Sequence, residues 1–147
     1  MLRIRLTRSA GSFLVAFMAV ATALVTGHAV VAADVGAALK LKPDKLDFGP
    51  VVATASSAPL TITVTNKSRT DSITFNSIVA TETFSIQSDQ CSNSPLAPGS
   101  SCKVEVVFHP LVTGTVNDQN GLTFTDSAPN SPQHIELAGQ GTVGSFF

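Results

Sequence analysis

The sequence contains no tryptophan or tyrosine, and it has only two cysteines, two methionines and three histidines among 147 residues. Both methionines and one histidine lie in the first 33 residues, so residues 34–147 retain two histidines, His109 and His134. A blue-copper site needs two histidines, a cysteine and usually a methionine, and zinc sites need closely spaced cysteines or histidines. These shortages predict that the chain has no metal or cofactor site.

Recognisable catalytic motifs are also missing. The sequence has no Gly-x-Ser-x-Gly motif. His109 follows Cys102 by seven positions, which places the two side chains on opposite faces of an extended strand. The aspartates are scattered at the ends of expected strands, where this residue commonly caps turns: Asp44, Asp47, Asp71, Asp89, Asp118 and Asp126. We therefore expect no catalytic residue and no enzyme, and we interpret DQNG (residues 118–121) as a hairpin turn rather than a calcium loop.

Charge is absent from residues 9–33, which contain no Asp, Glu, Lys or Arg. This span follows the basic start MLRIRLTRS and contains the apolar run FLVAFMAVATALV. Val31 and Ala33 then supply the small residues that a signal peptidase recognises. The pattern predicts a helical secretory signal peptide over residues 1–33, cleaved after Ala33.

An uncleaved anchor is the alternative, because 25 uncharged residues can cross a bilayer of about 30 Å as a helix. Both alternatives export residues 34–147 to the periplasm, the cell envelope or the medium, and only the anchor attaches them to a membrane. Residues 34–147 contain 6 basic and 10 acidic residues, a formal net charge of −4. This excess of acid argues against nucleic acid as a partner.

Alternation of apolar and polar residues dominates the rest of the chain. PLTITVTN (59–66) alternates apolar residues with threonines, and CKVEVVFHP (102–110) has the same period of two. Six further runs read as strands: LKLKP, KLDFG, SITFNSIVA, TFSIQ, GLTFTD and HIELAG. Turn-forming residues separate the runs at intervals of about 8–12 residues. This pattern predicts an all-β domain over residues 34–142, an antiparallel β-sandwich of seven to eight strands, and a short tail over residues 143–147.

The apolar sides of these runs provide the expected core. Its members are leucine, isoleucine, valine and phenylalanine: Leu46, Phe48, Leu60, Ile62, Val64, Ile73, Phe75, Ile78, Phe84, Ile86, Val104, Val106, Phe108, Leu122, Phe124, Ile135 and Leu137. Burial of each side chain contributes roughly 1.5–3 kcal/mol.

The two cysteines enclose the turn-rich loop SNSPLAPGSS. In an oxidising compartment two such cysteines normally form a disulfide. A bond between Cys91 and Cys102 would close a ring of 12 residues and stabilise the fold by roughly 3 kcal/mol. A catalytic thiol, the alternative, needs a neighbouring base, and His109 lies on the opposite face of its strand. We therefore expect a structural disulfide.

Five segments occur in an order that resembles a known family: PDKLDFGPV (43–51), ITVTN (62–66), FSI (84–86), LAPGSSCKVEVVFHP (96–110) and LAGQGT (137–142). The order is similar to that of the abnormal-spindle/Hydin (ASH) family of immunoglobulin-like domains, as found in bacterial exported proteins. The resemblance implies an immunoglobulin-like sandwich of about seven strands without established catalytic residues. Two segments depart from the family pattern, ATASSAP (53–59) and TVNDQNGLTF (115–124).

Together, the residues and the resemblance predict an exported, non-enzymatic immunoglobulin-like module for protein–protein interaction or structural support in the cell envelope. Its partner would be an unidentified protein, reached through an edge strand that a partner strand extends. A module that binds carbohydrate or calcium on its loops is the alternative, although the lack of Trp and Tyr weighs against sugar stacking. NKS at Asn66 is a glycosylation sequon, which matters only in a eukaryotic secretory path.

Overall fold

The computed structural model describes residues 38–145. The expected signal segment, residues 1–33, and residues 146–147 of the expected tail lie outside the described residues. The described part is all-β, with eight strands: β1 (Leu39–Lys42), β2 (Lys45–Val52), β3 (Leu60–Asn66), β4 (Phe75–Ala80), β5 (Phe84–Asp89), β6 (Ser101–Phe108), β7 (Gly114–Asp126) and β8 (Gln133–Thr142). Within it, no helix is long and apolar enough to span a membrane.

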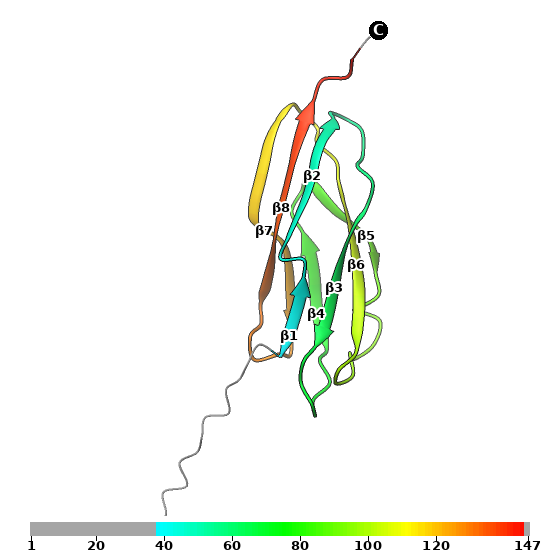
Figure 1. The fold of residues 1–147 in the computed structure, drawn as a ribbon, viewed down its shortest axis with the longest axis vertical. Helices are drawn as coiled ribbons and strands as arrows, with labels where there is room; N and C mark the ends of the chain where they lie inside the picture. Colours follow the sequence, from blue (N-terminus) through cyan, green and yellow to red (C-terminus); the bar gives the residue numbers. More distant parts are fainter. Residues whose placement is uncertain (1–37, 146–147) are drawn as a thin grey trace, which may run out of the picture. The chain divides into compact units, whose positions relative to one another are not determined.

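The strands form two four-stranded sheets, which we call sheet A (order β1-β3-β6-β5) and sheet B (order β2-β8-β7-β4) (Figure 1). Side chains alternate between the core and the outer face, as they do along any strand. In β6, the side chains of Cys102, Val104, Val106 and Phe108 are buried, whereas the residues between them are exposed or half-buried. The structure therefore confirms the predicted all-β sandwich.

One strand pair corrects the expected antiparallel arrangement. β2 pairs with β8 in parallel, from Lys45 opposite Glu136 to Val52 opposite Thr142. The reason lies in residues 43–44, which carry the chain from sheet A to sheet B between β1 and β2. β2 and β8 are not joined by a hairpin, a connection that would make them antiparallel, so β2 can lie parallel to β8 in sheet B. The other strand pairs are antiparallel.

The interpretation of residues 118–121 as a hairpin turn is wrong. These residues lie inside β7, which pairs with β8 on both sides of them. Asp118 lies opposite Leu137 and Leu122 opposite Ile135, so four steps along β7 match two steps along β8. The extra residues form a bulge, in which the Asn120 N–H donates to Asp118 Oδ1 at 2.9 Å. An added Cβ at residue 121 would lie 2.7 Å from Leu137 Cβ, which explains the glycine at that position.

The core confirms the sequence-based prediction. Of the expected members, Phe48, Leu60, Ile78 and Ile86 are half-buried and pack against the core, and the others are buried. The buried apolar set also contains residues outside the expected core: Leu39, Cys91, Leu96, Cys102, Ala128 and Ala138. Several of these lie in turns or at strand ends, where the period of two gives no signal.

Three phenylalanine rings fill the core between the two sheets near the end of β6. The rings of Phe84 and Phe108 stack at a centroid distance of 5.0 Å, and Phe48 lies 5.6 Å from Phe84 and 5.9 Å from Phe108. Such rings need no hydrogen-bond partner when buried. The cluster joins β2 of sheet B to β5 and β6 of sheet A.

Candidate interaction surfaces

A disulfide joins Cys91 to Cys102, with Cα atoms 5.2 Å apart. It links the loop after β5 to the second residue of β6, and both cysteines are buried. The loop is also held by Asp89 Oδ1, which accepts from the N–H groups of Cys91 at 2.7 Å and Ser92 at 3.1 Å. The predicted cysteine pair therefore closes a loop against the core.

The two histidines lie apart and each contacts a hydroxyl group. His109 Nδ1 lies 3.1 Å from Ser56 Oγ, and His134 Nδ1 lies 3.0 Å from Thr123 Oγ1. Neither is paired with an acid in the described residues, and residues 38–145 contain no group of three His, Cys, Asp or Glu side chains placed to hold a metal ion.

Four aspartates cap turns. Each accepts a hydrogen bond from the backbone N–H two residues later: Asp47 from Gly49, Asp89 from Cys91, Asp118 from Asn120 and Asp126 from Ala128. This is the geometry of an Asx turn, which holds the local backbone. Their carboxylates are thus engaged locally rather than gathered into one site.

Asp126 differs from the other three because it is buried. Its Oδ1 accepts from Ala128 N–H at 2.7 Å, but its Oδ2 is buried without a hydrogen-bond partner among the described residues. Both amide atoms of Gln133 are also buried and unpartnered there. Burial raises the pKa of the Asp126 carboxyl above its ordinary value, although the hydrogen bond from Ala128 and the neighbouring Gln133 amide lower it.

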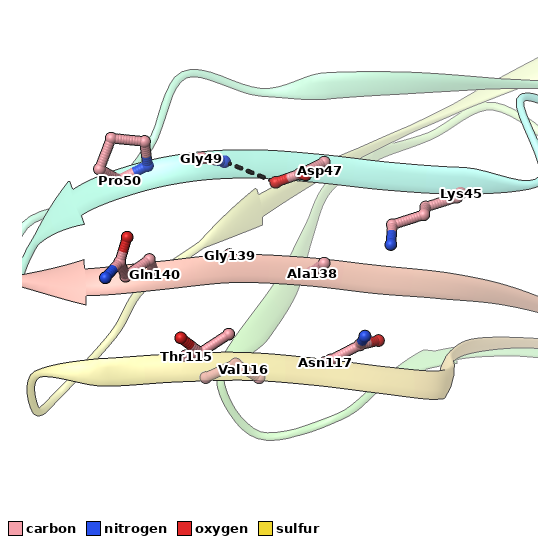
Figure 2. Close-up of a pocket in the computed structure, with 10 residues that line it drawn as sticks. All are labelled: Lys45, Asp47, Gly49, Pro50, Thr115, Val116, Asn117, Ala138, Gly139 and Gln140. Atoms are coloured by element: carbon pink, nitrogen blue, oxygen red, sulfur yellow. Dashed lines mark hydrogen bonds between the residues drawn. The ribbon is translucent and has the colours of Figure 1, made fainter.

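A shallow hollow of about 350 Å³ lies on the outer face of sheet B. Figure 2 shows β2, β8 and β7 side by side there. Ala138 lies opposite Asp47 on one side and opposite Asn117 on the other. The methyl group of Ala138 is small, so the longer side chains of Asp47, Asn117 and Gln140 surround a depression.

The two charged side chains that line this hollow are each engaged by a neighbouring group. Asp47 Oδ1 accepts from the Gly49 N–H at 2.9 Å (Figure 2). Lys45 Nζ donates to Glu136 Oε1 at 2.8 Å, and this bond raises the pKa of Lys45. The described lining contains no aromatic ring, histidine or cysteine. The charged groups of the hollow are thus held by neighbouring groups, and its described lining offers no aromatic platform.

Asn66 is a residue whose role the sequence-based reasoning missed. Its side chain is fully buried at the end of β3. Nδ2 donates to the carbonyl groups of Asp71 at 2.7 Å and Leu96 at 2.9 Å, and Oδ1 accepts from Ser68 N–H at 2.9 Å. Asn66 thus ties the loop after β3 to the loop before β6. With these atoms engaged and the side chain buried, the NKS sequon is not an acceptor in the folded domain. The sequence feature that could have indicated this role is the asparagine at the end of the strand run ITVTN.

One end of the domain exposes apolar side chains. Val52 is 44% exposed, Leu111 70%, Val112 75% and Val143 76%. We call these four residues the uncharged tip, because the segments that supply them (48–66, 106–117 and 137–145) contain no Asp, Glu, Lys or Arg. Figure 1 shows the ends of β2 and β8 and the start of β7 together at this end.

The backbone around the uncharged tip is held by hydrogen bonds between segments. Thr54 N–H donates to Pro110 O at 2.7 Å, and Ala53 N–H donates to Thr142 O at 2.8 Å. The backbone of Gly141 also contacts Val112 O, where an added Cβ would clash. These contacts hold the segments that carry the four apolar side chains beside one another.

Solved structures with the same fold come from bacteria and from humans. A protein of unknown function from Porphyromonas gingivalis W83 has a TM-score of 0.55 at 12% identity, over 71% of this chain and 46% of that one. The Vibrio cholerae VesB protease has a TM-score of 0.53 at 19% identity, over 70% of this chain and 32% of that one. The ASH/PapD-like domain 7 of human CEP192 has a TM-score of 0.51 at 10% identity, over 74% of this chain and 88% of that one.

This chain thus spans less than half the length of the first two of these proteins. No curated protein matches its sequence. Residues 37–140 match the family described as the HYDIN/CFA65/VesB-like, Ig-like domain. The match covers every strand of both sheets, apart from the last two residues of β8. The chain therefore belongs to the HYDIN/CFA65/VesB-like family of immunoglobulin-like domains, in agreement with the ASH resemblance of its sequence.

Proposed function

We propose that residues 34–147 form an exported module that binds another protein in the cell envelope and has no catalytic activity. The observation that carries this proposal is the uncharged tip, with four exposed apolar side chains on a domain that otherwise carries dispersed charges. Exposed apolar surface is costly in water unless a partner covers it. Membership of a family of immunoglobulin-like interaction domains supports the same function.

Two features support export. The uncharged span after a basic start has the pattern of a secretory signal. The disulfide between Cys91 and Cys102 is a bond that persists in oxidising compartments and is rare in the cytosol. A protein recovered from the cell envelope should therefore begin at Asp34 if the signal is cleaved, and its mass should be two hydrogens below that of the reduced chain.

The absence of catalysis is supported by the use that the domain makes of its polar residues. Asp47, Asp89, Asp118 and Asp126 cap turns, and the cysteines are joined to each other. Catalysis needs a nucleophile or acid–base pair held near a space for substrate, and in the hollow of sheet B Lys45 is bonded to Glu136 and Asp47 accepts from the Gly49 N–H. A catalytic turnover that a single side-chain substitution abolishes would contradict this part of the proposal.

Site-specific photo-crosslinking in the exporting cell tests the binding function. The full chain would carry a photoreactive residue in place of Leu111 at the uncharged tip, Val79 on β4, or Gln140 on the outer face of sheet B. A discrete protein adduct from Leu111, with none from Gln140, is the expected result, and an adduct from Val79 would mark a separate contact on β4. Adducts should be lost from Leu111 when Val112 is replaced by lysine, because a charge at the tip requires desolvation on docking. Absence of discrete adducts from all three positions would overturn the proposed function.

A further inference from the structure

The sandwich has four edge strands: β1 and β5 in sheet A, and β2 and β4 in sheet B. An edge strand with free N–H and C=O groups can accept a strand from a partner, and proteins usually block such edges. The four edges of this domain differ sharply in how they are blocked.

β1 is blocked by an asparagine from the loop between β7 and β8. The Leu39 N–H donates to Asn130 Oδ1 at 3.4 Å, and Asn130 Nδ2 donates to Leu39 O at 3.3 Å. The Lys67 N–H donates to Ala38 O, and the backbone groups along β1 alternate between β3 and the free edge. Lys40 and Lys42 therefore bond to β3. In a strand of four residues, this leaves Leu41 with free groups at the edge.

β2 is blocked by its own sequence. The Gly49 N–H donates to Asp47 Oδ1 at 2.9 Å, so this donor is already used. Pro50 follows and has no N–H. The register with β8 also shifts between Asp47 and Pro50. A partner strand would therefore meet a bulge, a proline and a charged side chain on this edge.

β5 is interrupted in its middle. Its register with β6 shifts between Ile86 and Ser88. At its start the Phe84 N–H donates to Thr81 O at 2.7 Å, and at its end Asp89 O accepts from Asn93 Nδ2 at 3.4 Å. The regular part of this edge is too short to hold more than one residue of an added strand.

β4 has none of these devices over Ser77–Ala80. These residues pair in continuous register with Thr125–Leu122 of β7, and the register shift of β4 lies before them. The Thr81 N–H donates to Gly121 O at 2.9 Å. Antiparallel ladders alternate, so Val79 bonds to β7 and the N–H and C=O groups of Ile78 and Ala80 point to the free edge.

The side chains of β4 define what this edge can accept. Residues 72–81 contain no charged residue and no proline, and Leu122–Thr125 of β7 contain none either. Val79 is 55% exposed on the outer face, whereas Ile78 is half-buried and packs against the core. An added strand would meet Val79 and hydroxyl groups on the outer face and apolar side chains on the inner face. A charged side chain beside Val79 would find no ionic partner there.

We propose that β4 is the docking strand of this domain, and that an extended, uncharged segment of a partner protein adds to it as a fifth strand of sheet B. Backbone hydrogen bonds to Ile78 and Ala80 hold the segment, and an apolar or β-branched side chain lies beside Val79. This inference rests on the proposed binding function and assigns its partner chemistry.

A library of random peptides displayed on phage is the probe, selected against the exported protein. Enriched peptides should be uncharged, with β-branched or apolar residues at alternate positions. Ala80→Pro removes a free edge N–H without removing a bond to β7. The variant should bind a selected peptide with about tenfold lower affinity than the wild type does. Ala80→Val enlarges the same side chain but keeps the N–H, so it should bind like the wild type.

Hydrogen exchange gives a second measurement that does not depend on a variant. The amides of Ile78 and Ala80 should exchange freely in the unbound protein and become protected when the peptide binds. Peptides that bind equally well to Ala80→Pro and protect other amides would overturn the assignment of β4, while leaving the binding function intact. The assignment of β4 would also be overturned if no selected peptide bound the wild type more tightly than the Ala80→Pro variant. The crosslink from Leu111 tests the binding function separately. A dimer that Ala80→Pro converts to monomer would identify a second copy as the occupant and overturn the proposed partner.

Discussion

The ring of Phe108 lies against the backbone of Gly139, so that a Cβ at residue 139 would be 2.6 Å from Phe108 Cε1. This contact brings β6 of sheet A and β8 of sheet B together at the phenylalanine cluster. Phe108 is fully buried and stacks on Phe84, so its ring has little room to move away. The absence of a side chain at residue 139 is thus a packing requirement.

Gly139→Ala is expected to destabilise the domain by about 1–3 kcal/mol, because overpacking displaces a buried ring. For a domain of this size, each kcal/mol lowers Tm by roughly 4–8 °C. Gly144→Ala is the matched control, since its Cβ would lie 3.5 Å from Val52 Cγ1, an ordinary contact. Calorimetric melting of both variants checks the prediction, and equal Tm values would contradict it.

Reduction of the disulfide is expected to lower the free energy of unfolding by about 2–4 kcal/mol. The bond reduces the number of conformations that the loop between Cys91 and Cys102 can adopt in the unfolded chain. Urea titrations with and without reductant measure the difference. The double variant Cys91→Ala/Cys102→Ala is the control, because its stability should not respond to reductant. Unchanged stability of the wild type on full reduction would refute the structural role of the bond.

Asn66→Asp is expected to cost at least about 3 kcal/mol. The substitution replaces the Nδ2 donor by an acceptor that faces the carbonyl groups of Asp71 and Leu96, and it buries a charge. Asn120→Asp changes the same chemistry at an exposed site in the β7 bulge and should alter stability by less than about 0.5 kcal/mol. Denaturant titration of the two variants makes the comparison, and similar values for both would show that Asn66 is not a structural link.

Asp126 predicts a pH dependence of stability. Burial raises the pKa of its carboxyl in the folded state, so the folded protein holds this proton more tightly than the unfolded chain does. The stabilisation by this group is therefore fully present below the unfolded pKa, and it is lost as the pH rises through the raised folded pKa. Above that pH the folded state retains the cost of a buried carboxylate.

Asp126→Asn should remove this contribution and leave a protein whose stability falls less as the pH rises above the ordinary range of an aspartate. Asn keeps an Oδ1 acceptor for Ala128 N–H. Urea titrations over a pH series measure the difference between wild type and variant, which cancels the contributions of other carboxylates. Asp118→Asn, at another Asx turn, is the control. Parallel curves for wild type and Asp126→Asn would contradict the assignment.

The alternation of apolar residues predicted most of the fold. A buried face requires side chains at every second position, so runs such as ITVTN and CKVEVVF could be placed on strands and oriented from the sequence. Residues 118–121 were misplaced because Asn, Asp and Gly suit a bulge as well as a turn. Local composition does not tell whether the chain reverses at such a point or continues along the same neighbour.

The candidate surfaces were less predictable. The sequence showed that segments 48–66, 106–117 and 137–145 lack charge, but their meeting at one end follows from the sheet order. The protection of β1 depends on Asn130, 91 residues away along the chain. An edge strand is open or blocked according to contacts of this range, so the general expectation of an edge could not name the strand.

By itself, the sequence determined the alternating strands, the members of the core and the pair of cysteines, because period, apolarity and compartment act on local or single-residue properties. The tertiary structure decided the parallel pairing of β2 with β8, the bulge in β7, the burial of Asn66 and Asp126, and the openness of β4. These features depend on which distant backbone groups find each other. That outcome is set by packing of the whole domain, since the backbone hydrogen bonds and most buried polar groups must be satisfied together.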